Sequence, residues 1–274
     1  FTAVRAQLTP FLAGLGFRPK RVRYVPVSGL TGENVASRDP RGPLAAWYDG
    51  PTFLEAVDAF TPAPRATERP FRMTVSDVGP AGRSSGPGGA GVIVSGKVLQ
   101  GRVRPGERVL VMPLGDIATV TRIERGGTAA LKATAGDATE LSLAGFTPER
   151  IAVGGILCKA RTPAAVGRRF DCQIVALPAL ATPIVKGTEF QLHTHAVDAM
   201  VHCSRLAALV DSGGEVLSRR PRCVLSGQTA HIRLSSARGP LCLERYGDCR
   251  PLGRFVLRQR GATVAVGLVL AVVD

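Results

Sequence analysis

The sequence predicts a mainly β protein in which two antiparallel β-barrels follow a shorter α/β segment. Three observations support this prediction. From residue 71 onward, short apolar runs of strand length recur, and glycine or proline separates them. Residues 1–60 instead carry apolar side chains at helical spacing. Residues 61–70, TPAPRATERP, contain three prolines and no apolar pattern, which indicates a linker between the two parts.

The start of the chain predicts a helix. Five apolar residues repeat there at helical spacing: Phe1, Val4, Leu8, Leu12 and Leu15. Pro10 lies inside this pattern and is expected to kink or split the helix, because proline has no N–H to donate.

A strand and a second helix complete the α/β segment. The run VRYVPV, residues 22–27, predicts a strand that ends at a Ser-Gly-Leu loop. The run GPTFLEAVDAF, residues 50–60, predicts a helix with Pro51 in its first turn. The apolar residues of this helix share one side: Phe53, Leu54, Val57 and Phe60.

The remaining sequence is expected to form the two barrels. Short strands at this spacing favour one barrel over residues 71–160 and another over residues 164–274, each near the common domain size of about 100 residues. Four glycines recur every fifth residue in the first barrel: Gly91, Gly96, Gly101 and Gly106. Glycine within strands marks bulges or close backbone approach, which suits a tightly closed barrel.

Positive charge predicts a polyanionic partner. The chain has 35 Lys and Arg against 21 Asp and Glu, a formal net charge of +14, which favours RNA or a ribosome surface. Basic residues cluster in three stretches, 17–23, 217–223 and 254–260. Each stretch could contact phosphates, or could be a charged strand edge that prevents sheet-to-sheet association.

The sequence shows no pattern of catalytic or metal-ligating residues. Gly96-Lys97 is followed by Val98 rather than Ser or Thr, so it does not match a phosphate-binding loop. His193 and His195 alternate within a predicted strand and share a face, but no further ligands at familiar spacing complete a zinc site.

The cysteines and the hydropathy indicate a cytoplasmic protein without a membrane span. No apolar run reaches about 18 residues, the length that a transmembrane helix requires. No pair of cysteines has Cys-x-x-Cys spacing, and we interpret all six as reduced thiols, mostly buried: Cys158, Cys172, Cys203, Cys223, Cys242 and Cys249.

Several longer motifs resemble one family. VPVSGLTGENV (25–35), followed by WYDGPTFLEAVDAF (47–60), resembles the end of the G domain in the elongation factor 1-alpha group of translational GTPases. GAGVIVSGKVLQGRVRPGERVLVMP (89–113) is similar to the second domain of that family. PLGRFVLRQRGATVAVGLVLAV (251–272) is similar to the closing strands of its third domain. The resemblance covers nearly the whole chain and keeps the family's order.

The resemblance implies a domain arrangement and a nucleotide site. Residues 1–60 would be the C-terminal remnant of a P-loop G domain, 61–70 the linker, and 71–160 and 164–274 barrel domains II and III. Ser28 and Gly29 would offer backbone amides to the guanine base, and Leu30 an apolar surface beside the ring. The intact family member would bind GTP and Mg²⁺. The phosphate-binding loop, both switch regions and the Asn-Lys-x-Asp-type motif have no counterpart in this chain, so neither cofactor nor catalysis is expected of the chain alone.

Four further stretches favour one branch of the family. PFRMTVSDV, TPIVKG, GGEVLSRRPRCVLSGQTA and CLERYGDCRPLGRF look most like the ribosome-rescue branch, the Hbs-type GTPase that works with Pelota. The partners implied are a Pelota-like protein and the ribosome with its rRNA. The release-factor GTPase, with a class-one release factor, is the first alternative, and the elongation factor, with aminoacyl-tRNA, is the second. The loop between Val78 and Gly91 looks longer than is usual for the family.

Two hypotheses outside this branch of the family remain. A stand-alone RNA-binding barrel protein would expose aromatic side chains for base stacking, yet aromatics make up only 5% of the residues. A GTPase subunit of sulfate-activating enzymes would share the barrel arrangement, but the GRF and TVAVG pattern near the end of the chain argues against it.

Overall fold

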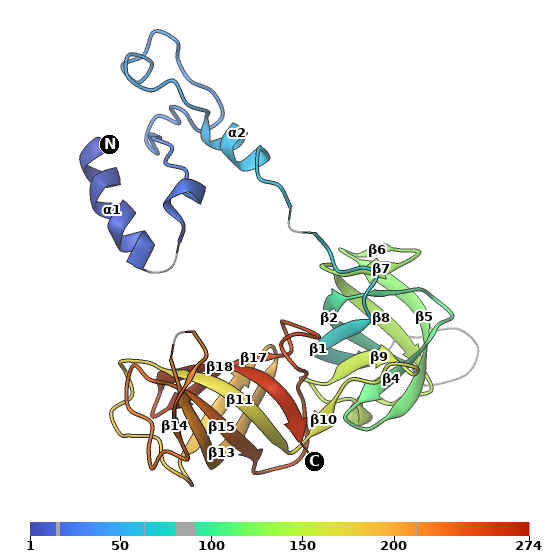
Figure 1. Ribbon diagram of the computed structural model, residues 1–274. Helices are drawn as coiled ribbons and strands as arrows, with labels where there is room; N and C mark the ends of the chain where they lie inside the picture. The colour runs from blue at the N-terminus through green and yellow to red at the C-terminus, as the bar shows by residue number, and fades with distance from the viewer. Residues whose placement is uncertain (15–16, 63, 81–90, 212, 274) are drawn as a thin grey trace. The chain divides into compact units, whose positions relative to one another are not determined.

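The strands expected beyond residue 71 form two closed antiparallel barrels in the computed structural model (Figure 1). The structure describes residues 1–14, 17–62, 64–80, 91–211 and 213–273. The chain folds as two compact units, Phe1–Pro64 and Arg65–Asp274, and the second unit contains both barrels. The 79–89 loop that the sequence singled out lies almost wholly outside the described residues.

Six strands close the first barrel. In the order of their pairing they are β4 (Arg108–Met112), β9 (Ile156–Lys159), β1 (Arg72–Pro80), β2 (Gly91–Gln100), β8 (Ala138–Ala144) and β5 (Asp116–Arg125), and β5 pairs back with β4. Short elements complete it: β3 (Arg102–Val103), β6 (Thr128–Ala129), β7 (Ala133–Thr134) and the 3₁₀ turn η2 (Pro148–Arg150). Side chains alternate in and out along each strand, so β8 buries Leu141 and Leu143 and exposes Glu140.

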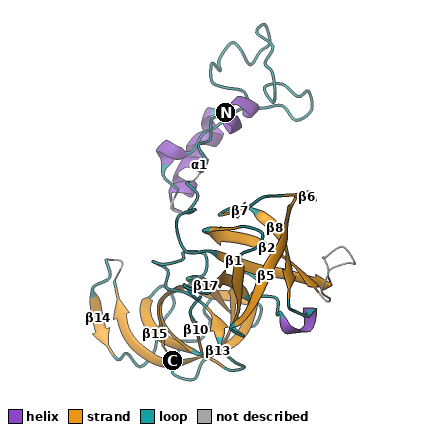
Figure 2. Cartoon of the chain, turned by 90° about the vertical axis from the view of Figure 1, so that its right-hand side faces the viewer, coloured by secondary structure: helices purple, strands orange, loops and turns teal. Residues whose placement is uncertain are grey.

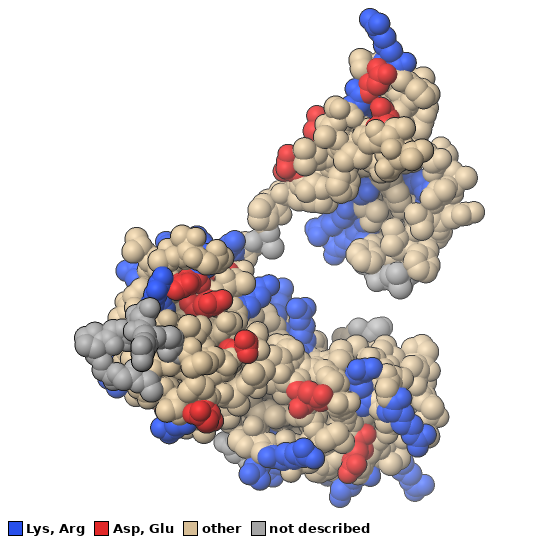
Figure 3. Space-filling model, turned by 180° about the vertical axis from the view of Figure 1, so that it is seen from behind, with Lys and Arg blue, Asp and Glu red and all other residues tan. Residues whose placement is uncertain are grey.

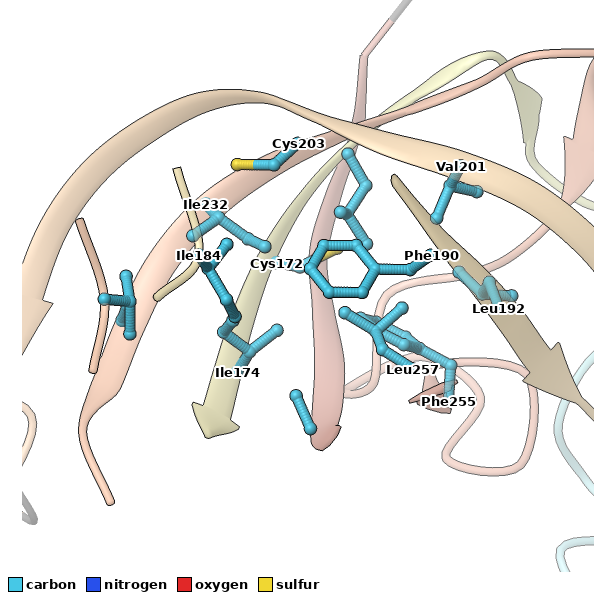
Figure 4. Packing of buried hydrophobic residues seen from close by; sticks show 14 of the residues in the cluster. Cys172, Ile174, Ile184, Phe190, Leu192, Val201, Cys203, Ile232, Phe255 and Leu257 are labelled. Atoms are coloured by element: carbon cyan, nitrogen blue, oxygen red, sulfur yellow. The ribbon is translucent and has the colours of Figure 1, made fainter. Parts of the chain in front are cut away.

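The second barrel closes in the same way. Its strands pair in the order β12 (Glu189–Thr194), β17 (Arg254–Gln259), β18 (Ala262–Val273), β11 (Arg169–Ala176), β15 (Thr229–Ser236) and β13 (Val197–Val210), and β13 pairs back with β12. The short strand β14 (Val216–Arg219) adds to the outer edge of β13, and β10 (Val166–Gly167) pairs with β16 (Leu241–Cys242). Figure 4 shows Phe190, Leu192 and Leu257 meeting inside this barrel. The prediction of a mainly β protein with two barrels is confirmed.

The two barrels are joined by a buried contact rather than by a linker alone. A small apolar cluster lies between them, made of Ile156, Cys158, Ala164, Cys242, Cys249 and Leu252. Beside it, Arg72 from β1 donates from Nε to Glu244 Oε1 over 2.7 Å, and both side chains are only 7% exposed. Figure 2 shows the two barrels from a second direction. The ion pair and the apolar cluster together form a buried contact between the two barrels.

The first unit differs from the sequence prediction in three places. Residues 22–27 form no strand. A strand needs a hydrogen-bonded neighbour, and no strand lies among the described residues of this unit. Helix α1 (Thr2–Gly14) continues through Pro10, so the expected split does not occur. Helix α2 (Phe53–Asp58) starts after the N-cap Thr52, which leaves Pro51 before the helix rather than in its first turn.

The start of α2 has a specific cause. Thr52 accepts a hydrogen bond from the Glu55 N–H over 3.2 Å, and the Glu55 carboxylate accepts one from the Thr52 N–H over 2.8 Å. This reciprocal capping box satisfies two of the N–H groups that a helix start leaves unpaired. The sequence TFLE therefore fixes where α2 begins. A further short 3₁₀ turn, η1 (Pro19–Arg21), lies between the two helices.

No helix among the described residues is both long enough and apolar enough to cross a membrane. All six cysteines are free thiols, and all except Cys223 are buried. Burial raises the pKa of Cys242 to about 12 and of Cys249 to about 11, so these two thiols stay protonated at neutral pH.

The buried Asp137 links Arg65, the first residue of the second unit, to the loop after β7 in the first barrel. Asp137 Oδ1 accepts a hydrogen bond from Arg65 over 2.7 Å, and Oδ2 accepts from the Thr134 N–H over 2.9 Å. Burial alone would raise the pKa of Asp137, but the hydrogen bonds from Thr134 and Arg65 outweigh it, and the net shift is downward.

We expect Asp137→Asn to lower the free energy of unfolding by about 1–3 kcal/mol at neutral pH. The folded-state pKa lies below the ordinary value of 3.8, so the stabilisation is present above that value and is lost as the pH falls through the folded-state pKa. Urea unfolding of both proteins across pH measures this. The difference between them should shrink in acid; a constant difference at every pH would contradict the assignment.

Candidate functional site

The loop predicted to hold the guanine base forms a closed turn. The Ser28 N–H donates to the Glu33 carbonyl over 3.0 Å, and the Gly32 N–H donates to the Ser28 carbonyl over 2.9 Å. The Ser28 hydroxyl accepts a further bond from the Thr31 N–H over 3.3 Å. The turn therefore has a fixed shape that its own backbone sets.

The exposed side of this turn carries Gly29 and Leu30. The Leu30 side chain is 97% exposed, an unusual state for leucine. No acceptor among the described residues pairs with the Gly29 or Leu30 N–H, whereas the Ser28 N–H is already used within the turn. Of the three predicted residues, Gly29 and Leu30 are thus free to contact a ligand, and Ser28 acts mainly by shaping the loop.

Asn34 anchors the loop, and the sequence analysis did not identify it. Asn34 is fully buried and has φ of 60°, a left-handed conformation that asparagine tolerates better than most residues. Its side chain donates to the Pro26 carbonyl over 2.7 Å, and its own carbonyl accepts from the Phe53 N–H over 3.0 Å. Asn34 therefore links the turn to the start of α2. The one sequence feature that could have indicated this role is an asparagine, a residue that tolerates the left-handed conformation, two positions after Gly32.

The apolar side of α2 is largely uncovered in this chain. Four residues predicted to share that side have exposed fractions of 41–64%: Phe53, Leu54, Val57 and Phe60. The Phe1 ring, in contrast, packs against another aromatic ring: its centroid lies 5.4 Å from that of Trp47. The first unit thus presents exposed apolar side chains on and just after α2.

The second candidate site is a groove between the two barrels. It has a volume of about 1040 Å³, and its walls include Val98 and Leu99 from β2 and Phe255 and Val266 from the second barrel. The charged residues that line it are Lys97 and Arg254, and no Asp or Glu lines it among the described residues. The groove therefore combines apolar walls with positive charge.

His193 and His195 both line this groove. His193 lies on β12, whereas His195 follows the strand with φ of 36°, so the predicted alternation within one strand does not extend to His195. Burial lowers the pKa of His195 to about 4, and a hydrogen bond with the Cys242 backbone raises it only in part. This imidazole is therefore neutral at physiological pH. No cluster of three metal-ligating side chains occurs among the described residues.

Comparison with known proteins shows which proteins this chain resembles. Residues 169–270 match the family described as GTP-eEF1A C-terminal domain-like. The chain is 32% identical over 275 residues to elongation factor 1-alpha of Pyrobaculum calidifontis, covering 99% of this chain and 59% of that protein. It is 33% identical over 270 residues to Protein HBS1 of Drosophila melanogaster, covering 98% of this chain and 39% of that protein. The chain thus spans between two fifths and three fifths of the length of these relatives.

Solved structures show the same similarity. The structure of Sup35 complexed with GDP has a TM-score of 0.68 and 29% identity, and covers 98% of this chain and 64% of that chain. Sup35 complexed with GMPPNP has a TM-score of 0.67 and 30% identity. The match extends over both barrels and the first unit, since nearly the whole chain is covered. The chain is therefore similar, over nearly its whole length, to a C-terminal portion of the elongation factor 1-alpha group, the portion that contains the two β-barrels.

Proposed function

We propose that this chain is the docking portion of a cytoplasmic translational GTPase that acts in ribosome rescue with a Pelota-like partner. The observation that carries the proposal is the joining of two barrels into one body by the buried Arg72–Glu244 pair. A fixed two-barrel body can hold a protein partner in a defined orientation. Similarity to Protein HBS1 over 98% of this chain supports the rescue branch.

The groove between the barrels is the surface that we assign to this partner. Its apolar walls suit the apolar residues that form the centre of a protein interface. Lys97 and Arg254 suit acidic residues on the facing protein, because complementary charge favours specific association. The barrels would position the partner, and a rigid-body change between domains would release it into the ribosomal site.

Nucleotide would bind outside the barrels. In the intact family member, GTP with Mg²⁺ would supply the phosphate chemistry that drives the domain change. In this chain, we assign Ser28, Gly29 and Leu30 to the base side of that site, with Leu30 beside the ring and the free Gly29 N–H available to the base. Phosphate contacts supply most nucleotide affinity, so these three residues alone should not retain GTP.

The domain boundaries also remain proposals. We assign residues 1–60 to a G-domain remnant, 61–70 to a linker, 71–160 to domain II and 164–274 to domain III. The compact units divide at Pro64, inside the proposed linker.

A pull-down with this chain immobilised tests the function. We expect it to retain a Pelota-like protein in preference to a class-one release factor or aminoacyl-tRNA. Substituting both groove cations, Lys97→Glu and Arg254→Glu, should weaken retention at least about tenfold, since like charges across an interface repel. The matched control is Arg18→Glu with Arg21→Glu, which changes the net charge equally on the first unit.

Other outcomes would reassign the protein. Preference for the release factor would move it to termination. Preference for aminoacyl-tRNA would move it to elongation. Retention of none of the three, with partners shown to be folded, would contradict the proposed function.

A further inference from the structure

The edge strand β14 carries positive charge that no described residue neutralises. Arg219 ends this strand, Arg220 follows it directly, and Arg222 comes after Pro221. All three are exposed, and none makes an ion pair or side-chain hydrogen bond with the described residues. Arg233 on β15, by contrast, makes two bonds of 2.7 and 2.8 Å to Asp171. Three arginines close together in the sequence thus carry charge without an acid partner among the described residues.

The strand is placed to meet a partner. β14 pairs with β13 on one side, and no described strand pairs with its other side. Figures 1 and 2 place β14 on the side of the second barrel away from the first barrel. Figure 3 shows Lys and Arg side chains gathered over this side of the second barrel. The surface is thus separate from the groove that we assign to the protein partner.

Arg205 extends the positive surface onto the neighbouring strand. The Arg220 N–H donates to the Ala207 carbonyl over 2.9 Å, which places the end of β14 beside this part of β13. Arg205, two residues away on β13, is exposed and has no side-chain partner among the described residues. The acids of the hairpin itself, Asp211 and Glu215, lie at its turn, and Asp211 is used to cap that turn. Arg205 lies opposite Arg233 on β15, and Arg233 already pairs with Asp171.

From this arrangement we propose that Arg205, Arg219, Arg220 and Arg222 form a contact site for an RNA phosphate backbone. Four guanidinium groups without acid partners suit the regular negative charge of RNA, and arginine binds phosphate through paired N–H donors. The inference rests on the proposed function, because it assigns this surface to ribosomal RNA. It differs from partner binding, which uses the groove.

A simpler explanation is that these charges only protect a sheet edge. Charged side chains on edge strands prevent association with other sheets, and β14 also exposes Val216 and Leu217. That explanation predicts self-association, and no change in RNA affinity, when the arginines are removed. The two explanations can therefore be separated by one set of variants.

The test is fluorescence anisotropy with a fluorescein-labelled RNA hairpin and this chain, residues 1–274. The variant is Arg219→Gln, Arg220→Gln and Arg222→Gln together; the charge-matched control is Arg18→Gln, Arg21→Gln and Arg23→Gln. We expect the first variant to lose roughly 10- to 100-fold in affinity at low salt. The slope of log affinity against log salt should fall by about 2 to 3 in magnitude, one for each lost phosphate contact.

Three outcomes would overturn the inference. One is an equal loss in the control, which would reflect net charge alone. Another is unchanged RNA affinity together with new self-association, as edge protection predicts. A third is equally strong competition by polyglutamate, which would indicate an acidic protein as the natural partner. The pull-down measures retention of a Pelota-like protein separately. Failure of the RNA site would therefore leave the proposed function standing, and failure of the pull-down would not depend on the RNA result.

Discussion

Replacing Arg72 with methionine should destabilise the second unit by about 3–5 kcal/mol, because it leaves the Glu244 carboxylate buried without a charge partner. Arg72 also donates to the carbonyls of Phe71 and Thr162 over 2.9 and 2.8 Å. These acceptors would lose their donor at the same time. Since Arg72 lies on the first barrel and Glu244 follows β16 of the second, the loss should fall on the contact between the barrels.

Calorimetric unfolding with a double-mutant comparison isolates this effect. The wild-type barrels should unfold in one transition, and the Arg72→Met barrels in two. Adding Glu244→Met should recover most of the lost stability, because a buried pair replaced by apolar groups of similar volume is often neutral. The control Arg122→Met removes an exposed ion pair with Glu124 and should cost less than about 1 kcal/mol. A similarly small cost for Arg72→Met would mean that the pair does not hold the barrels together.

Replacing Gly96 with valine should prevent the first barrel from closing. A Cβ atom at Gly96 would lie 1.7 Å from the Thr74 carbonyl oxygen on the neighbouring strand, inside any possible contact distance. The obstacle is backbone in a paired strand, so no side-chain rotation relieves it. The register between β1 and β2 shifts nearby, at Val75 and Asp77, which brings the two backbones together at this point.

We expect Gly96→Val to cost more than about 3 kcal/mol, beyond the usual range for overpacking, and to leave little soluble protein. Hydrogen exchange on the soluble fraction should show fast exchange in β1, β2 and β8 and retained protection in the second barrel. Gly79→Ala is the matched control in the same strand pair, because a Cβ there meets nothing within 4 Å. Comparable stability of the two variants would show that β1 and β2 approach less closely than described.

The barrels could be predicted because their causes are local in sequence. Alternating apolar residues and regularly spaced glycines indicate each strand separately. A closed barrel is then favoured because it gives every short strand a hydrogen-bonded neighbour on both sides. Gly96 and Gly101 illustrate this: the sequence predicted close backbone approach, and a Cβ at Gly101 would lie 2.5 Å from the Phe71 Cα. Gly106, in contrast, has φ of 86° with no atom nearby, so it serves a turn instead.

Features that depend on distant residues could not be predicted from the sequence. Arg72 and Glu244 are 172 positions apart, and nothing in either neighbourhood indicates the other. The strand expected at 22–27 was wrong for a related reason, since a strand forms only beside a partner and no other described strand lies in the first unit. Asn34 was missed because its role depends on the path of the chain through Pro26 and Phe53.

The candidate site was predicted only in part. Ser28, Gly29 and Leu30 do form an exposed turn, but their contact with a guanine base remains a prediction that nucleotide binding in a longer family member must test. The groove between the barrels combines residues from β2, β12 and β17. It could not be recognised before the two barrels were placed against each other.

The central claim is that two barrels fixed against each other dock a Pelota-like protein. Titration calorimetry of this chain with a Pelota-like protein, and with a class-one release factor in the same buffer, tests it most directly. The account predicts tighter binding of the Pelota-like protein, and weaker binding when Arg72→Met loosens the contact between the barrels. Tighter binding of the release factor, or binding that Arg72→Met leaves unchanged while calorimetry shows the barrels uncoupled, would contradict it.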